Sequence, residues 1–549
     1  MNETLSPFFT EVGWTVGGLL LVVAVTGLSR RVGWSAPLVL VAVGVVLSFL
    51  PFTPDVRLDP EVVLIAVLPA LLFAAALQTS FPEVRARGDS ILALSVGLVL
   101  FSVVAIGAAA YWLLGAFIPG VTLAVGLAFG AILAPTDAVS VGALAGSGRL
   151  PRRLASLLEG EGLLNDATAL VSLNTAIVAI SSPGAGFGNA FGGFAVAVLG
   201  GLSVGIVVAW AIVRVRRRLK APVLDTSISL ATPYVAYLPA AAAHGSGFLA
   251  VVVTGLWLGY RAPSFQSAES RVAERINWRT VSFLLENGVF LLIGLQLKGI
   301  VVQAADSDIS IAAGVLVIAG VYVAMVLARF VYVFAATVLY RYGPELLRER
   351  RWDWRTAFAI SFSGVRGVVT LAAVFLLPPA TPGVGFLKLA AFVIVVLSLL
   401  QGLGIGPLVR RLRLPLPNPE QDRVQIRSLV AEAQSAAIAR LEQEATEEDP
   451  AELVSSLRRS AEYRVVIGTT DEEGLIAQPD SYSRLRLLML DSERRAVLDA
   501  QREGRYEDSV IEAVLGDFDT IETALKRSYR RDLQPAPRSR RFRLRRGPS

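Results

Sequence analysis

Long apolar segments follow one another over the first 410 residues, and this repetition constrains the fold more than any other feature. A helix of about 20 apolar residues crosses a hydrocarbon core about 30 Å thick. The second and ninth segments are short, which leaves the number of spans open by one. We expect thirteen spans, at residues 12–28, 36–50, 60–77, 90–114, 120–146, 153–180, 188–213, 225–243, 247–260, 279–301, 309–340, 354–377 and 384–409.

Charge is distributed unevenly along the chain. Charged residues make up 17% of the sequence, against about a quarter in soluble globular proteins. From Pro415 onward, however, there are 22 Lys or Arg and 25 Asp or Glu residues. We therefore expect an all-α polytopic membrane domain at 1–412, a linker at 413–421, a small helical cytosolic tail domain at 422–530 and a basic, disordered end at 531–549.

Basic residues in the connectors predict the orientation. Every second connector, beginning with the one that holds Arg30 and Arg31, is basic, and this set has 24 Lys and Arg residues; the alternate connectors have three. Basic connectors stay on the cytoplasmic side. The pattern predicts a plasma-membrane protein with its N-terminus outside and its tail in the cytoplasm. Only Glu3 and Glu11 are charged before the first span, so we expect a retained helix rather than a signal peptide.

Several classes of function are disfavoured by composition. The chain has no cysteine and one histidine, His244, in a predicted loop. Disulfides and thiolate metal sites are excluded. An intramembrane enzyme is disfavoured because there is no cysteine and the one histidine lies outside the predicted site. The net charge of +6 is carried mainly by membrane connectors, so we expect no nucleic-acid partner and no cofactor.

A few charged residues inside the predicted spans need explanation, because each costs at least about 2.5–3.5 kcal/mol at the centre of a membrane helix and needs a partner or a purpose. An ion pair or a position near a span end is the ordinary interpretation for Glu159, Asp225, Glu286 and Arg329. The other four lie near mid-depth or beside interrupted helices, and they are Asp137, Glu161, Asp166 and Arg366.

Two of the spans are predicted to be interrupted. Pro135 should break the fifth span, and Gly364 and Gly367 permit unwinding of the twelfth. These spans run in opposite directions, as an inverted repeat would place them. Transporters bind their ions at such interruptions. We expect two crossed, interrupted helices within inverted repeats.

The charges suggest a chemistry for this crossing. If Arg366 pairs with Glu161, Asp166 is left without a fixed counter-charge. A carboxylate removed from water binds a proton more readily unless a cation takes its place. Na⁺ is a hard ion that suits oxygen ligands, and Asp166, Thr136 and the freed backbone carbonyl near Ala134 offer them. A site that accepts either ion is the minimum for exchange.

Four segments carry a resemblance to a known family. They read APTDAVSV (134–141), EGEGLLNDATALV (159–171), FLLENGVFLLIGLQL (283–297) and SGVRGVVTLAA (363–373). In these segments the sequence resembles monovalent cation:proton antiporter family 1, the NhaP and NHE type of sodium/proton exchangers. The four segments stand in the family's order and spacing, and the resemblance covers roughly residues 10–412.

The resemblance implies a role for each residue of the site. Asp166 would carry the cation and the proton, beside Asn165, which is associated with electroneutral exchange. Thr136 would give an oxygen to the ion, and Asp137 would compensate helix-end dipoles. Glu161 and Arg366 would form a structural ion pair. The family fold further implies a homodimer whose protomers each have a dimerisation domain and a moving core domain.

Three positions depart from the family pattern. Relatives usually carry a Glu after a Leu-Phe pair in the third span, where this chain has Ala74 after Leu72-Phe73. Many carry Ser where it has Gly162, and Gly where it has Ala167. The departures at Ala74 and Gly162 each remove an oxygen donor. They leave open a K⁺/H⁺ or broad monovalent-cation/H⁺ antiporter as the alternative to Na⁺/H⁺ exchange, with transported Na⁺, K⁺ or Li⁺. A channel or a non-transporting membrane sensor is the alternative from another class.

The tail offers fewer signals. Helical spacing recurs at 429–444, 451–464, 483–501 and 509–526, and a regulatory domain or a loosely ordered appendage would both fit. Six arginines between Arg538 and Arg546 are expected to be disordered, with attraction to anionic lipid as the sharper alternative.

Overall fold

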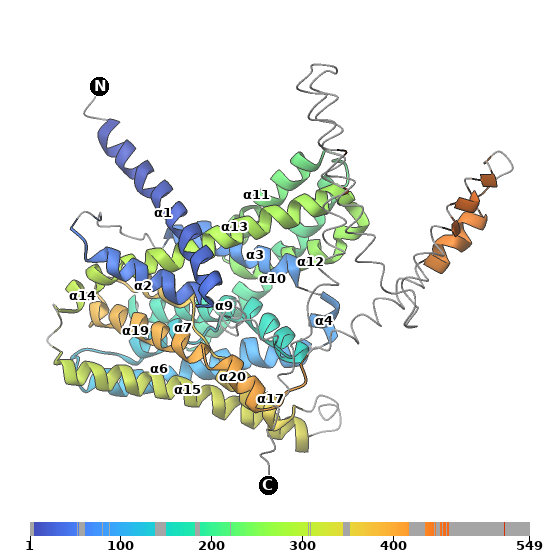
Figure 1. The fold of residues 1–549 in the computed structure, drawn as a ribbon. Helices are drawn as coiled ribbons and strands as arrows, with labels where there is room; N and C mark the ends of the chain where they lie inside the picture. The colour runs from blue at the N-terminus through green and yellow to red at the C-terminus, as the bar shows by residue number, and fades with distance from the viewer. Residues whose placement is uncertain are drawn as a thin grey trace, which may run out of the picture. The chain divides into compact units, whose positions relative to one another are not determined.

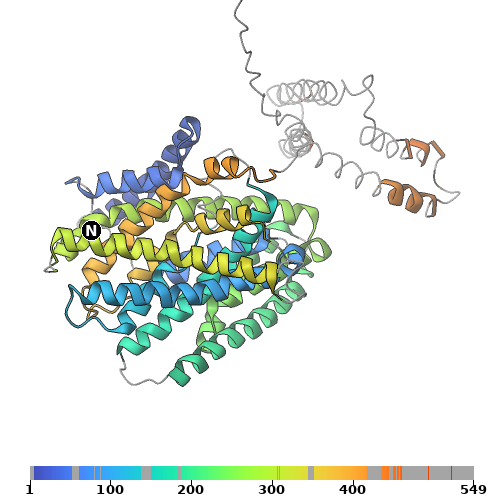
Figure 2. The same cartoon turned by 90° about the horizontal axis from the view of Figure 1, so that it is seen from below.

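The computed structural model describes residues 5–416 with gaps at 52, 54–60, 80, 87, 138–149, 182–186, 220, 306, 308 and 344–351. Beyond Leu416 it describes chiefly parts of 434–459. The chain divides into two compact units, Met1–Leu416 and Pro417–Ser549. Every regular element in the described residues is a helix (Figures 1 and 2). The predicted all-α membrane fold is confirmed in this respect.

The helices of the first unit follow the predicted apolar segments. In chain order they are α1 (Leu5–Val32), α2 (Ala36–Ser48), η1 (Val62–Val67), α3 (Leu68–Gln78), α4 (Phe81–Ala86), α5 (Gly88–Leu92), η2 (Ala93–Leu98), α6 (Val99–Gly115), α7 (Leu123–Leu133), α9 (Arg152–Ser181), α10 (Phe187–Arg216), α11 (Pro222–Ala242), α12 (Gly247–Phe265), α13 (Ala268–Leu295), α14 (Leu297–Ala305), α15 (Ile311–Tyr342), α17 (Trp354–Phe362), α18 (Val368–Val374), α19 (Val384–Gly402) and α20 (Ile405–Arg411).

Eight helices in the described part of the chain are long and apolar enough to cross a membrane. Several others, such as α2 and α7, are shorter apolar helices. The chain is therefore an integral membrane protein with many spans, and the count of thirteen stays a prediction.

Both predicted interruptions are present. Helix α7 ends at Leu133 and residues 134–137 are non-helical; helix α17 ends at Phe362, residues 363–367 are non-helical, and α18 begins at Val368. Proline and glycine account for the two breaks, as expected. Residues 138–149 lie outside the described residues, so the crossing of the two helices and the inverted repeat stay predictions.

Glycines allow the helices around these breaks to pack closely. A Cβ atom at Gly130 of α7 would lie 2.4 Å from the carbonyl oxygen of Val103 in α6. A Cβ atom at Gly44 of α2 would lie 2.4 Å from the carbonyl oxygen of Leu291 in α13. Small residues let membrane helices approach where no hydrophobic driving force exists between them. Helix α13 is thus fixed against α2.

The second unit is described only in part. Residues 434–443 are helical, and an exposed ion pair joins Arg458 to Glu442 at 3.3 Å. The predicted helices at 483–501 and 509–526 and the arginines from Arg538 to Arg546 lie outside the described residues, apart from two isolated positions.

Candidate functional site

A cavity of about 870 Å³ lies within the first unit. Its lining includes Thr136, Asp137 and Asp166, beside the break that follows α7. It also includes Trp34, which is 67% exposed, whereas Asp166 is 9% exposed. The cavity therefore leads from the surface to a nearly buried carboxylate.

Polar side chains are linked around the first break. The Asn165 amide donates to the carbonyl oxygen of Thr136 (2.8 Å) and to its hydroxyl (3.1 Å). The Thr136 hydroxyl in turn donates to the Glu161 carboxylate at 2.7 Å. Asn165 and Glu161, four residues apart on α9, thus hold the non-helical Thr136 from one face of that helix.

The counter-charge of Glu161 is Arg329 of α15. Arg329 Nη1 lies 2.5 Å from Glu161 Oε1, and Nη2 lies 2.9 Å from Oε2. The predicted Glu161–Arg366 ion pair is therefore wrong, whereas the interpretation of Arg329 as a member of a buried ion pair is confirmed. A guanidinium matches a carboxylate at two points, and α15 presents Arg329 in that geometry while Arg366 faces carbonyls.

Arg366 binds backbone oxygens at both breaks. Its Nε donates to the carbonyl of Leu133, the last residue of α7, at 2.9 Å, and its Nη1 donates to the carbonyl of Gly364 at 2.5 Å. The last carbonyls of a helix have no partner within the helix, and a cation there is favoured by the helix dipole. Arg366 therefore stabilises the interrupted backbone.

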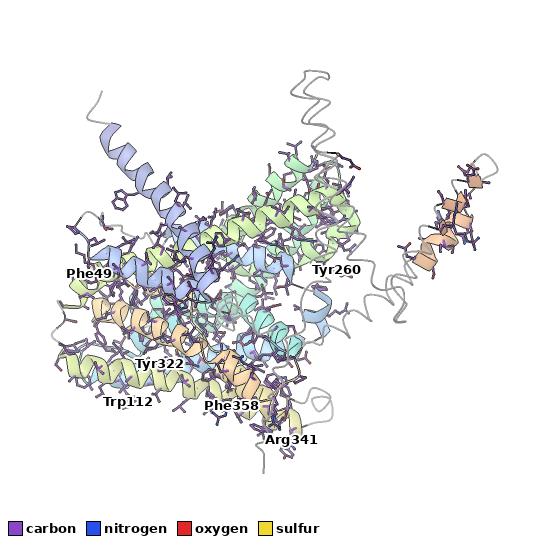
Figure 3. The ribbon with its side chains drawn as sticks, viewed as in Figure 1. Phe49, Trp112, Tyr260, Tyr322, Arg341 and Phe358 are labelled. Atoms are coloured by element: carbon purple, nitrogen blue, oxygen red, sulfur yellow. The ribbon has the colours of Figure 1, made fainter. Side chains whose placement is uncertain are left out.

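The end of α17 is capped in the same manner. Arg329 Nε donates to the Ile360 carbonyl at 3.0 Å. Gln401 of α19 donates to the Phe362 carbonyl at 2.8 Å and accepts a hydrogen bond from the Tyr322 hydroxyl at 2.6 Å; Tyr322 is labelled in Figure 3. The carbonyls of Ile360 and Phe362 are thus each given a side-chain donor.

The two interrupted segments touch each other at Asp137. Its amide donates to the carbonyl of Val365 at 2.8 Å. Its carboxylate lies against Gly367, where a Cβ atom would be 2.1 Å from Asp137 Oδ2. A carboxylate before the first residue of α18 is favourably placed for the helix dipole, which agrees with the predicted role of Asp137.

Asp166 and Glu286 differ from Glu161 because their carboxylates have no partner among the described residues. Both line the cavity, and neither makes a hydrogen bond or an ion pair with any described residue. The Oδ1 atom of Asn165, fully buried beside Asp166, likewise has no hydrogen-bond partner there. Burying such groups without partners is costly, so together they mark a place that a ligand could occupy.

Glu286 is the residue that sequence reasoning missed. Its place near the middle of α13 could have been read from the sequence, but no break in α13 drew attention to it. Glu159 also lines the cavity, as does Gly162.

The prediction that Ala74 faces the site is wrong. Ala74 is 1% exposed and is not among the residues that line the cavity, whereas its neighbour Ala75 is. Leu68, Leu71 and Leu72 of α3 line it too, and with Ala75 they share one face of a helix with 3.6 residues per turn. Ala134 is buried and does not line the cavity, so its carbonyl as an ion ligand stays a prediction.

Comparisons with known proteins agree with this geometry. The family described as "Sodium/hydrogen exchanger, transmembrane" matches residues 18–411. An uncharacterized Na⁺/H⁺ exchanger of Mycobacterium tuberculosis is 32% identical over 93% of this chain and 96% of its own length.

The chain belongs to the sodium/hydrogen exchanger family. It is therefore a membrane transporter and not an enzyme.

Two further bacterial relatives and one solved structure are similar to this sodium/hydrogen exchanger. An uncharacterized Na⁺/H⁺ exchanger of Escherichia coli is 30% identical over 94% of this chain and 99% of its own length. The sodium, potassium, lithium and rubidium/H⁺ antiporter of Bacillus subtilis is 32% identical over 66% of this chain and 55% of its own length. The sodium proton antiporter MjNhaP1 from Methanocaldococcus jannaschii shares the fold, with a TM-score of 0.60 at 19% identity over 74% of this chain and 99% of its own.

Proposed function

We propose that this exchanger moves a monovalent cation, first of all Na⁺, against protons by alternating access at Asp166. Family membership supports cation/proton antiport as the activity. One observation carries the choice of residue: Asp166 lines the cavity without a partner in the described residues, while Glu161 is neutralised by Arg329. Of these two carboxylates of α9, Asp166 alone is free to bind either a proton or a monovalent cation.

The competition between ions follows from the surroundings of Asp166. A nearly buried carboxylate is stabilised either by a bound proton or by a cation close to it. Neutral oxygens that suit Na⁺ lie beside it, at the Thr136 hydroxyl and the unpartnered Asn165 Oδ1. If one Na⁺ replaces one H⁺ at a single carboxylate, exchange is electroneutral.

The side from which ions enter is proposed from the cavity mouth. Arg30 and Arg279 line the cavity, and both are exposed. They belong to the connectors that the positive-inside pattern assigns to the cytoplasm. This conformation would then expose Asp166 to the cytoplasm, and alternation would expose it outside. A homodimer with a fixed dimerisation domain and a moving core remains part of this proposal.

Broad cation selectivity is the second candidate. Ala75 and Gly162 line the cavity without offering side-chain oxygen, and small cations gain most from additional oxygen ligands. The name of the Bacillus subtilis relative includes potassium, lithium and rubidium beside sodium. Both points support transport of K⁺ together with Na⁺.

Proton flux in proteoliposomes tests the proposal. Purified protein is reconstituted, and proton movement is followed after addition of Na⁺, Li⁺ or K⁺, with the membrane potential either clamped or free. Coupled proton flux that is insensitive to the potential is the expected result. Ion current without coupled protons would indicate a channel, and no movement of either ion would indicate a sensor.

A further inference from the structure

A second pocket, of about 400 Å³, lies where the end of α10 meets α12, away from the carboxylate cavity. Arginine and tryptophan dominate its lining, and no acidic residue contributes to it. We call it the arginine pocket. Its lining residues are Trp210, Val213, Arg214, Arg217, Arg218, Trp257 and Arg261.

The four arginines of this pocket are exposed and uncompensated. None of their side chains makes an ion pair or a hydrogen bond with a described residue. Their neighbour Arg216 behaves differently: it is 1% exposed and pairs with Asp225 at 2.7 Å and with Glu274 at 2.9 Å. Asp225 and Glu274 are thus engaged with Arg216 inside the protein, and the outward arginines keep their charge.

The pocket is preformed by close packing of its two helices. The Thr254 hydroxyl of α12 donates to the carbonyl of Gly205 in α10 at 3.0 Å. A Cβ atom at Gly205 would lie 2.8 Å from the Ala250 carbonyl oxygen, so glycine is required there. One to two turns further on, this contact sets Trp257 and Arg261 beside Trp210 and Arg214.

The tryptophans orient two of the arginines. The guanidinium of Arg214 lies 5.7 Å from the ring centroid of Trp210, and that of Arg261 lies 5.8 Å from the ring centroid of Trp257. Such cation–π contacts restrain the charged group without neutralising it. The guanidinium groups are held ready for an anion.

The surface around the pocket is apolar and faces lipid. On α10, Val207 is 63% exposed and Trp210 is 61% exposed, and Tyr260 of α12 is 53% exposed (labelled in Figure 3). Tryptophan and tyrosine gather where membrane helices meet the headgroup layer. The composition around the arginine pocket is therefore that of a lipid-facing surface that ends at the headgroup layer.

We propose that the arginine pocket binds the phosphate group of an anionic phospholipid from the adjacent leaflet. Arginine is suited to two-point recognition of phosphate oxygens, and basic pockets between membrane helices hold anionic headgroups. Exposed tryptophan rings flank the arginines and offer a surface to the glycerol and acyl chains. A soluble phosphate would use the arginines alone and would leave the rings in contact with bulk lipid.

Lipid titration of the purified full chain tests this site. Binding of phosphatidylglycerol and of phosphatidylcholine is measured by native mass spectrometry in the wild type, in Arg214→Gln/Arg217→Gln/Arg218→Gln/Arg261→Gln, and in a control, Arg341→Gln/Arg355→Gln/Arg410→Gln/Arg411→Gln. The control also removes four exposed arginines, and Arg341 and Arg355 also lie over aromatic rings.

The wild type and the control should prefer phosphatidylglycerol, and the pocket variant should lose affinity by about fivefold for each arginine removed. The double variant Arg214→Gln/Arg261→Gln keeps Arg217 and Arg218 and should lose affinity by about 25-fold. Equal loss in the control, or no loss in either pocket variant, would overturn the proposal. Displacement of the lipid by millimolar inorganic phosphate would make this a free-phosphate site and would overturn the assignment to lipid.

Discussion

Arg329 and Glu161 form a buried two-point ion pair, with Nη1–Oε1 at 2.5 Å and Nη2–Oε2 at 2.9 Å. It joins α15 to α9, and Arg329 Nε extends it to the Ile360 carbonyl at the end of α17. One guanidinium thus neutralises a carboxylate and caps a broken helix. Because Glu161 is neutralised, our proposal assigns the exchange of ions to Asp166.

Loss of Arg329 should destabilise the protein. Arg329→Gln strands the Glu161 charge in an apolar interior, and removing one member of a buried pair costs about 3–5 kcal/mol. We expect lower thermal stability and lower expression, both restored in part by Glu161→Gln in the double variant. Thermal unfolding in detergent, analysed as a double-mutant cycle, measures the coupling.

Arg366 provides the matched control for this cycle. Arg366→Gln removes donors from the Leu133 and Gly364 carbonyls and should also destabilise, but its coupling to Glu161→Gln should be weaker than that of Arg329→Gln, because Arg366 makes no ion pair with Glu161. Strong coupling between Glu161 and Arg366, with none between Glu161 and Arg329, would contradict the ion pair described here.

Asp166→Asn should abolish Na⁺-dependent proton flux while leaving the protein folded. The amide has the same shape as the carboxylate but cannot exchange a proton for a cation. Asp353→Asn, at an exposed residue before α17, makes the same chemical change outside the cavity and should transport normally. Flux in proteoliposomes is the measurement, and wild-type flux in Asp166→Asn would exclude Asp166 as the ion carrier.

Glu286→Gln should weaken cation binding without stopping transport. At pH values where its carboxyl group is ionised, Glu286 adds negative charge to the cavity that leads to Asp166, and such charge raises the local concentration of cations. The half-saturating Na⁺ concentration should rise several-fold, and by less at high ionic strength because salt screens the attraction.

Glu269→Gln serves as the control for Glu286, because Glu269 is exposed near the start of the same helix. If Glu286→Gln lost its maximal rate even at saturating Na⁺, Glu286 would be a second ion carrier. The attraction model would then have to be replaced.

Much of the fold could be predicted because a bilayer imposes simple rules. Apolar length marked the spans, and Pro135, Gly364 and Gly367 marked the breaks through backbone chemistry alone. The same residues located the site, since polar groups and broken backbone inside a membrane need partners. Asp166 and Thr136 were therefore found from sequence and line the cavity, and Asn165 donates hydrogen bonds to Thr136.

The choice of partners could not be predicted. Arg329 and Arg366 are both buried arginines, and which one meets Glu161 depends on how α15 and α17 pack against α9. Sequence position carries no information on that packing. The rotation of a helix about its axis could not be predicted from the sequence either. Neighbouring residues of a helix point about 100° apart. Ala74 is therefore buried among helices, whereas Ala75 lines the cavity.

This difference in rotation gives the last prediction. Ala75→Glu places a carboxylate in the cavity, where it should add an oxygen ligand for the cation. It should tighten apparent Na⁺ affinity more than K⁺ affinity, because the smaller ion gains more from each oxygen. Added negative charge near Asp166 also favours the protonated form, so the flux-versus-pH curve should move to higher pH.

Ala74→Glu is the matched variant, because the same carboxylate is introduced one residue earlier on the same helix. Ala74 is 1% exposed, and an unpaired charge there has neither water nor a counter-ion, so expression and thermal stability should fall. Cation affinity and pH profiles measured for both variants separate the two positions. A stable Ala74→Glu protein with tighter Na⁺ binding, beside an unchanged Ala75→Glu protein, would mean that α3 is rotated by one residue from the orientation described here.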